Sequence, residues 1–537
     1  MRVRRQLRPV APRPERRREV ERHLAAHGLL PGVRRLGAAP AGPPDRSGLA
    51  LRLREALPEL GPVFASFGLY LSTRADLFEL SECALLAGIP DRGEPLAPAV
   101  VEEILAAELR PEPFVLFEQE PLAARLLFQT HRAWPGEGRQ VVVRIARPDL
   151  EAEAAAEVEL LALLRPAFPA RGFAFEEVVA DFRRSLAARL DFRVQAEAFD
   201  LLSLDTEGSD LAAVPRVYRD LSTARILTLD WLDGLPLEQA ADGAGGEPAA
   251  AHDLARRLCL LWLRLALTCR RFPVEADLLR RRDGRIAVIG GTFSDPAGAS
   301  QLNLWAYLRG TAVHDPDLVF ECLSREVTAG PRAVPWSELR KRLRQAVPIR
   351  EEALSAGGES LAEHLLAHWR IVRGAGYRPL GYLQDFYRGL FRTAGTARRI
   401  APAGDTLRDP LREAFDDLQW LAGWSQMRQL ADPRKMVEAF EGYLTTMSVL
   451  PQQVERALQV LGREAGGRSA PAEPPPRERS SSAVVIALGM AMASLVLLTI
   501  RFSALPGRAG DWVEAFGALG FLLLGALVLR AAGGRRR

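Results

Sequence analysis

Two long apolar runs near the C-terminal end constrain the fold of this chain more than any other feature. Ala483–Ile500 contains no charged residue, and Trp512–Leu529 contains only Glu514. Either run alone could be a buried core helix, but each approaches the roughly 20 residues that a bilayer-spanning helix needs. Because the short segment Arg501–Asp511 joins them, we expect the pair to form a membrane hairpin.

The arginines around these runs predict the orientation of the hairpin. They are more numerous on its two outer flanks than in the connection: Arg468, Arg477 and Arg479 before it, Arg530, Arg535, Arg536 and Arg537 after it, and Arg501 and Arg508 between the runs. Flanks rich in arginine stay on the cytoplasmic side of a membrane. We therefore expect a bacterial-type inner-membrane protein with both termini and its large soluble part in the cytoplasm.

The rest of the chain has the composition of a globular protein with several domains. Its 537 residues exceed one ordinary core, and 48% hydrophobic with 26% charged residues exclude a fibrous or wholly disordered chain. A net charge of +4 gives no reason to expect a nucleic-acid partner. The four cysteines form no C-x-x-C pair, so neither a disulfide framework nor a zinc knuckle is indicated.

Apolar periodicity and turn residues divide the chain into six segments. In chain order we expect a basic arm (1–45), a helical extension (46–115), a β-rich domain (116–235), a mainly helical domain (236–465), a Pro/Arg/Ser linker (466–482) and the two spans (483–532). The arm has no apolar core of a signal peptide, and it either rests on anionic headgroups or only solubilises the chain. Strands are predicted at 141–145 and 225–231, and one long helix at 175–201.

Several short motifs follow one another along this layout. They are Gly61-Pro62-Val63-Phe64 with Gly68, Ser72-Thr73-Arg74-Ala75-Asp76, Pro121-Leu122-Ala123-Ala124 with Gln129 and His131, Val141-Val142-Val143-Arg144-Ile145, Leu190-Asp191-Phe192, Leu232-Asp233-Gly234 and Asp283-Gly284. In this order they resemble the UbiB-type, or AarF-type, family of atypical protein-kinase-like proteins, and the resemblance covers roughly residues 46–530.

The resemblance implies an α+β, bilobal kinase-like fold with a helical N-terminal extension and a C-terminal membrane hairpin. It implies a lid segment over the cleft, with Gly68, Ser72, Arg74 and Asp76 as its retained residues. The family's nucleotide positions correspond to Ala123, Ala124, Gln129, His131, Arg144, Asp191 and Asp233. For His131 a structural hydrogen bond is favoured over proton transfer, and Asp233 is first a turn residue between the lobes.

The nucleotide-facing positions depart from the pattern of the family. Ser66 and Leu69 stand where the K-x-G-Q motif has lysine and glutamine, and we expect that restoring those two residues leaves the fold intact. Arg125 and Leu126 add bulk to the alanine-rich loop. Two further substitutions affect charged positions. Arg144 replaces the phosphate-pairing lysine, and Arg189 replaces the acidic partner of that lysine.

The catalytic and metal-binding positions depart further. Arg271–Asp277 stands where the family has its H-A-D-P-H-P-G-N stretch, and Gly290-Gly291-Thr292 stands where it has D-F-G. Phosphoryl transfer in kinases needs metal ions held by the D-F-G aspartate and by an asparagine of the catalytic loop. The degraded positions Glu275, Asp277 and Gly290 therefore predict a pseudokinase with no resident metal; ATP and magnesium remain implied by the resemblance alone.

Two other arrangements of side chains could still bind a metal ion, and both stay open. Glu275, Asp277 and Asp295 could form a displaced metal site, although carboxylates near loops are usually just solvated. His364 and His368 have the i, i+4 spacing of a metal pair, but the sequence offers no third ligand.

Two classes of function follow. The first is a membrane-anchored, catalytically impaired protein that acts by binding or scaffolding. Its partners would be the lipid bilayer and isoprenoid quinone intermediates or the proteins that process them, because the resemblance implies a role in ubiquinone biosynthesis. The second is an active ATPase or atypical kinase of the same family with displaced metal ligands.

Overall fold

The computed structural model describes residues 7–30, 46–136, 138–168, 175–237, 239, 248–295, 298–346, 361–401 and 410–418. The chain divides into two units, Met1–Ala431 and Asp432–Arg537, and all described residues belong to the first. The predicted linker and both predicted spans lie outside them. Among the described helices, none combines the length and the apolarity that crossing a bilayer requires.

A helical extension precedes the sheets. It consists of α2 (Arg46–Glu59), α3 (Pro62–Leu71), α4 (Leu80–Ala87) and α5 (Pro98–Glu108), and a further helix, α1 (Pro14–Ala26), lies within the segment expected to be a basic arm. The first three helices after α1 pack against one another, and α3 is buried along nearly its whole length. A Cβ at Gly68 would lie 2.3 Å from Cδ1 of Ile89, so glycine at this position permits the close packing of α3.

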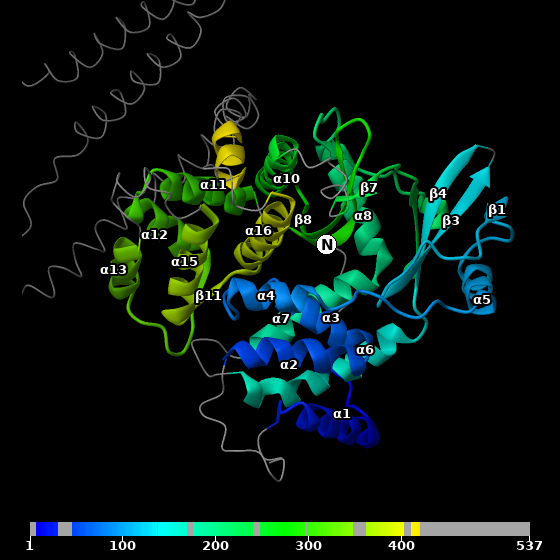
Figure 1. Ribbon diagram of the computed structural model, residues 1–537, viewed down its shortest axis with the longest axis horizontal. Coiled ribbons are helices and arrows are strands. Elements are labelled where there is room, and N and C mark those ends of the chain that lie inside the picture. Colours follow the sequence, from blue (N-terminus) through cyan, green and yellow to red (C-terminus); the bar gives the residue numbers. More distant parts are fainter. Residues whose placement is uncertain are drawn as a thin grey trace, which may run out of the picture. The chain divides into compact units, whose positions relative to one another are not determined.

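The first sheet has five antiparallel strands (Figure 1). They are β1 (Leu116–Phe117), β2 (Ala123–Ala124), β3 (Phe128–Gly136), β4 (Arg139–Ala146) and β6 (Ile226–Asp230). Val101 and Ile104 of α5 pack on the apolar side chains of β4. Both predicted strands are confirmed, and the β3–β4 hairpin places Arg144 opposite Thr130 and Leu227.

A helical stretch connects strands β4 and β6 of this sheet. It contains α6 (Leu150–Leu160), a 3-10 helix (Leu161–Ala167), α7 (Phe175–Leu190) and α8 (Phe192–Asp205), and a 3-10 turn at Arg219–Leu221 follows. The prediction of one long helix over 175–201 was wrong. The chain breaks at Asp191, which has extended backbone and accepts a hydrogen bond at 3.1 Å from the backbone N–H of Arg193, so it caps the N-terminus of α8.

A second sheet of four strands and a set of helices follow. The strands are β5 (Ala212–Ala213), β7 (Leu235–Pro236), β8 (Phe272–Arg280) and β9 (Ile286–Ser294), in the order β5-β9-β8-β7. The helices are α10 (Pro248–Thr268), α11 (Gly298–Ala312), α12 (Pro316–Arg325), α13 (Trp336–Ala346), α15 (Leu361–Gly374) and α16 (Gly381–Ile400), and β10 (Val327–Ala329) pairs with β11 (Tyr377–Pro379).

The β8–β9 hairpin is the element that positions the candidate site. Helices α10 and α16 pack on each other and on β8, as Figure 1 shows. The motif Asp283-Gly284 lies in the turn between these two strands, each of which is 9 residues long. Both degraded motifs thus fall on paired strands, and Asp277 lies opposite Gly290. The expected α+β class is confirmed.

Candidate functional site

Four arginines act electrostatically on the carboxylate of Asp277. Arg125 follows β2, Arg144 lies on β4, Arg189 on α7 and Arg392 on α16, whereas Asp277 lies on β8. We call these five residues the Asp277 cluster. Five separate elements supply its members, so the tertiary fold, and no local motif, assembles it.

One ion pair holds the Asp277 cluster together. Nη1 of Arg125 donates hydrogen bonds to Oδ1 of Asp277 at 3.1 Å and to Oδ2 of Asp91 at 3.0 Å. Burial alone would raise the pKa of Asp277, but the surrounding guanidinium groups hold it below its ordinary value. Asp277 is therefore an ionised carboxylate already engaged with arginine.

Arg144 is the most deeply buried cation of the cluster. Its side chain is 5% exposed, its Nη2 donates to the carbonyl of Ile289, and its guanidinium lies 5.2 Å from the ring centroid of Phe128. Its Nε has no hydrogen-bond partner among the described residues. Burial lowers the pKa of Arg144 to about 10, against the opposing attraction of Asp277. The group still carries its charge at neutral pH.

Because Gly290 has no side chain, the side chains of Asp277 and Arg144 can occupy the space next to it. A Cβ there would lie 2.6 Å from Oδ2 of Asp277 and 2.9 Å from Nη1 of Arg144. Such distances are shorter than carbon makes to these atoms, so any side chain would displace one of the two groups. The D-F-G aspartate implied by the resemblance has no room at Gly290 while Asp277 and Arg144 stay where they are.

The carboxylates considered for a displaced metal site do not converge. Arg388 binds Glu275, Arg271 binds Asp295, and Arg125 binds Asp277. In the described residues, the group of side chains close enough to share a metal ion is a different one, His23 with His27 and Glu59. There Nε2 of His23 lies 3.0 Å from the carbonyl of Ala56, which occupies that nitrogen.

The retained residues of the lid segment form a buried ion pair. Nε and Nη2 of Arg74 donate to the two oxygens of Asp76 at 2.8 and 2.7 Å, and both side chains are almost fully buried. Nε of Arg373 on α15 lies 3.4 Å from Oδ2 of Asp76. The Oγ of Ser72 donates to the carbonyl of Leu69 at 2.6 Å. The pair thus ties the segment after α3 to the helical domain.

The two positions that correspond to lysine and glutamine in K-x-G-Q face the interior. Ser66 is fully buried and its hydroxyl has no hydrogen-bond partner in the part of the chain that the structure describes. Leu69 is half-buried and packs against the core. Burying an unpaired ammonium is costly, so the expectation that Ser66→Lys with Leu69→Gln leaves the fold intact is corrected here: we expect it to destabilise the fold.

A polar network that sequence reasoning missed surrounds this lid. The hydroxyl of Tyr70 donates to Asp181 at 2.6 Å and accepts from Arg74 at 2.6 Å, and Gln384 donates to the same Asp181 oxygen. Arg388 also donates to Thr73 at 3.1 Å. One local feature of the sequence could have indicated this network, the i, i+3 spacing of Asp385 and Arg388 on α16. Oδ1 of Asp385 lies 3.3 Å from Nη1 of Arg388.

The other nucleotide positions implied by the resemblance have structural partners of their own. Ala123 and Ala124 form β2. Nδ1 of His131 donates to the carbonyl of Glu118 at 2.8 Å, and burial lowers the pKa of His131, so the ring is neutral. Gln129 bonds its Nε2 to the other ring nitrogen at 2.8 Å.

Two aspartates among these positions accept hydrogen bonds from residues close to them in the sequence. Asp191 caps α8, and Asp233 accepts from Nε1 of Trp231 at 2.6 Å. None of the hydrogen bonds described for Gln129, His131, Asp191 or Asp233 reaches the Asp277 cluster. Of the predicted nucleotide residues, Arg144 is the one that belongs to the Asp277 cluster.

The histidine pair on α15 is not a metal pair. His368 is buried, its Nδ1 lies 3.1 Å from the hydroxyl of Tyr307, and burial lowers its pKa to about 3. His364 instead packs edge-on against the ring of His314. His368 therefore belongs to the packed interior, and His364 is half-buried at its edge.

A cavity of about 320 Å³ opens beside the Asp277 cluster. Arg125, Asp277 and Arg392 form its charged part. Most of the remaining wall is apolar and comes from β7, α10, β8 and β9, with Leu258, Leu261, Trp262, Leu265, Val274 and Val288 among its residues. Its size lies at the lower end of the range for small-molecule sites. It can receive an apolar body that carries one charged end.

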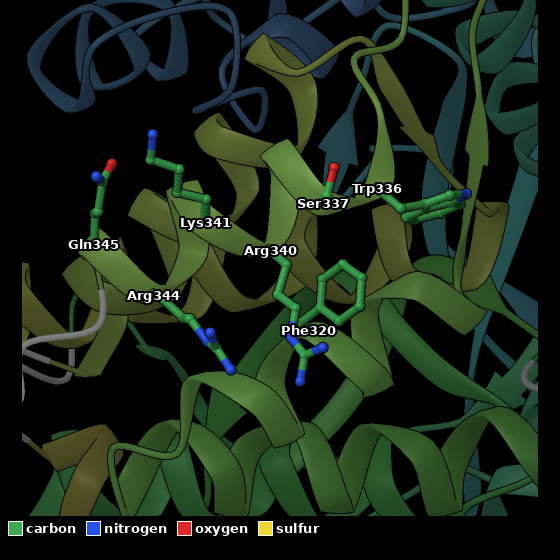
Figure 2. A pocket seen from close by; sticks show the side chains of 7 residues that line it. All are labelled: Phe320, Trp336, Ser337, Arg340, Lys341, Arg344 and Gln345. Atoms are coloured by element: carbon green, nitrogen blue, oxygen red, sulfur yellow. The ribbon is translucent and has the colours of Figure 1, made fainter.

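A second, more open hollow lies on α13 (Figure 2). Phe320 and Trp336 line it together with basic residues, and Figure 2 shows Arg340 and Arg344 pointing to one side and Lys341 to the other. Both arginines donate to Asp317 at 2.9 Å, which partly neutralises them. No residue of the motifs found in the sequence contributes to this hollow.

Comparisons with known proteins place Arg125, Arg144, Arg189 and Asp277, but not Gly290 or Arg392, within a recognised domain. Residues 89–279 match the family model of the ABC1 atypical kinase-like domain. The chain is 35% identical over 195 residues to a protein called probable protein kinase UbiB from Pseudomonas paraeruginosa, and 35% identical over 201 residues to one of the same name from Azotobacter vinelandii. These alignments cover 35% and 36% of this chain.

The chain spans little more than a third of the length of these relatives, 36% and 37%. A solved structure of Rv3197 with erythromycin from Mycobacterium tuberculosis is also similar, with 19% identity and a TM-score of 0.37 over 66% of this chain and 91% of that one.

Proposed function

We propose that this chain is a pseudokinase, from the premise that residues 89–279 match the ABC1 atypical kinase-like domain and that the chain is similar to proteins called probable protein kinase UbiB. It acts by binding or scaffolding and does not transfer phosphoryl groups. The Asp277 cluster occupies the position where the family resemblance puts magnesium and the phosphates of ATP.

The close approach of Gly290 to Asp277 and Arg144 carries this proposal. Kinase-type phosphoryl transfer depends on metal ions that bridge the phosphates and neutralise the developing charge. Here the position of the metal-binding aspartate has no side chain, and the nearest carboxylate is bound by Arg125. Losing one preorganised electrostatic contact costs about 2.7–4 kcal/mol in an activation barrier, and several are lost together.

The alternative of an active enzyme with displaced metal ligands finds less support. It requires Glu275, Asp277 and Asp295 to share a cation, yet a different arginine binds each of them. A metal ion would have to break ion pairs with three arginines before it could bind, one of which, Arg388, is itself 1% exposed.

We propose further that the ligands are lipid-derived intermediates of isoprenoid quinone biosynthesis, or the proteins that process them, and that the C-terminal hairpin anchors the chain to the inner membrane. The apolar wall of the cavity supports a lipid-like ligand. The two apolar runs of the sequence support the anchor. Their arrangement in the membrane lies outside the described residues.

Measuring the binding of a non-hydrolysable ATP analogue with and without magnesium tests this proposal. A pseudokinase of this kind shows no magnesium-dependent binding at sub-millimolar nucleotide and no ATPase activity above background.

A further inference from the structure

We infer that the cavity beside the Asp277 cluster binds an amphiphile that has an oxyanion head group, phosphate or carboxylate, and that it does so without a metal ion. This inference rests on the proposed function, because it requires that magnesium and ATP do not occupy the same space. It adds the chemical class of the ligand and the residues that recognise its head group.

The charges of the site are unbalanced toward the positive. Four guanidinium groups act electrostatically on Asp277, and two of them, those of Arg125 and Arg392, line the cavity. The second nearby carboxylate, Asp91, pairs with Arg125 alone. Among the described residues, no carboxylate lies within ion-pair distance of Arg189 or Arg392. Charges in a partly dehydrated site are costly unless they are paired, so the cluster is one that an additional anion stabilises.

The buried guanidinium of Arg144 does not line the cavity; it binds the carbonyl of Ile289, which does, and adds positive charge behind the wall. It is 5% exposed, it has an unpartnered Nε, and it binds no carboxylate at ion-pair distance. A guanidinium presents several N–H donors in a plane, which match the oxygens of a phosphate or carboxylate. In this site arginine donors therefore supply the positive charge that magnesium supplies in a kinase.

The wall of the cavity determines what the head group is attached to. Apart from its charged part, the lining is largely leucine, valine, proline and tryptophan. A free inorganic anion would leave this apolar surface in contact with water. An aliphatic chain that fills it removes this apolar surface from water, which favours binding.

Asp277 has a specific role in this arrangement. Its carboxylate competes with an incoming oxyanion for the same guanidinium groups, so removing its charge strengthens the binding of an anion. A metal ligand or a catalytic carboxylate at this position has the opposite behaviour, because its neutralisation weakens the binding of magnesium and ATP. Asp277→Asn thus separates the two readings of the site by the sign of its effect.

The test is calorimetric titration of the full chain in a nonionic detergent with EDTA present, using hexyl phosphate, hexanoate, hexanol and inorganic phosphate. We expect hexyl phosphate or hexanoate to bind, and hexanol and inorganic phosphate to bind at least tenfold more weakly. The comparison between the first two identifies the head group. Equal binding of hexanol, or a requirement for magnesium, overturns the inference.

Variants complete the test. Asp277→Asn is expected to tighten binding about tenfold, and Arg392→Gln to weaken it about tenfold, whereas Arg398→Gln on the same helix, whose side chain pairs with the exposed Glu363, leaves it unchanged. Weaker binding by Asp277→Asn contradicts the inference. If neither these probes nor ATP with magnesium bind, the inference fails and the pseudokinase proposal stands. If ATP with magnesium binds, the pseudokinase proposal itself fails.

Discussion

Asp277 and Gly290 are paired across strands β8 and β9, and an oxygen of Asp277 lies 2.6 Å from the point where a Cβ on Gly290 would be. The two residues come from two separate motifs of the family pattern, and their identities depend on each other. A side chain at position 290 would therefore displace the carboxylate of Asp277 or the guanidinium of Arg144.

The first prediction concerns this close approach. Gly290→Ala forces the buried guanidinium of Arg144 or the carboxylate of Asp277 to move. Because both crowded groups are the ends of side chains, we expect the free energy of unfolding to fall by about 1 kcal/mol, the low end for overpacked interiors. Gly395→Ala is the matched control, because nothing lies within 4 Å of the new Cβ and alanine favours the helix. Denaturant unfolding of both variants measures their free energies of unfolding. If the two values are equal, the Cβ at position 290 is not crowded and the prediction is wrong.

The second prediction concerns the lid segment. Asp76→Ala leaves Arg74 buried without its bidentate partner, and breaking a buried pair in this way costs about 3–5 kcal/mol. The melting temperature should fall clearly, whereas Asp317→Ala, which removes an exposed acceptor of two arginines, should change it little. A thermally neutral Asp76→Ala that abolished cellular function would make this residue part of a working site.

The third prediction concerns pH. Burial and the nearby charge of Asp181 raise the pKa of Asp385 to about 6, against the opposing pull of Arg388. The folded state therefore binds more protons than the unfolded state between about pH 4 and pH 6, so the free energy of unfolding falls as the pH rises through this window. Asp385→Asn should remove this fall, on the order of 2 kcal/mol.

Unfolding curves at several pH values between 4.5 and 7.5 test this expectation. Asp317→Asn serves as a control, because two arginines hold the pKa of Asp317 at about 2, below the window, and it should keep the slope of the unaltered protein. If Asp385→Asn also keeps that slope, Asp385 is not the group that titrates.

The fourth prediction concerns the membrane hairpin inferred from the sequence. With the connection Arg501–Asp511 on the outer side, Ser503→Cys should react with an impermeant thiol reagent on intact cells, and Ser480→Cys should not. The native cysteines are buried, so background labelling should be low. The reverse pattern refutes the orientation, and labelling at both sites refutes the hairpin.

Local patterns in the sequence were sufficient for most secondary structure. Apolar spacing predicted the helical extension over 46–115, which contains α3 and α5. The β-type run at Val141–Ile145 predicted the hairpin strand. The break at Asp191 was missed because the helical periodicity continues through it, and a capping side chain ends one helix and begins the next.

The candidate site could be predicted only in part. Sequence comparison identified Arg144, Asp277 and Gly290 as altered positions, but not their contacts. The ion pair between Arg125 and Asp277 joins residues 152 positions apart, and the hydrogen bond from Gln384 to Asp181 joins residues 203 apart. Such contacts arise from tertiary packing, and no spacing along one element encodes them.

The binding of an ATP analogue to the purified full chain, titrated with and without magnesium, tests the pseudokinase account most directly. The account predicts no magnesium-dependent heat and no magnesium-dependent rise in melting temperature at sub-millimolar nucleotide. A magnesium-dependent shift that Asp277→Ala or Glu275→Ala abolishes would contradict it, because these carboxylates would then hold a metal ion in place of their arginine partners.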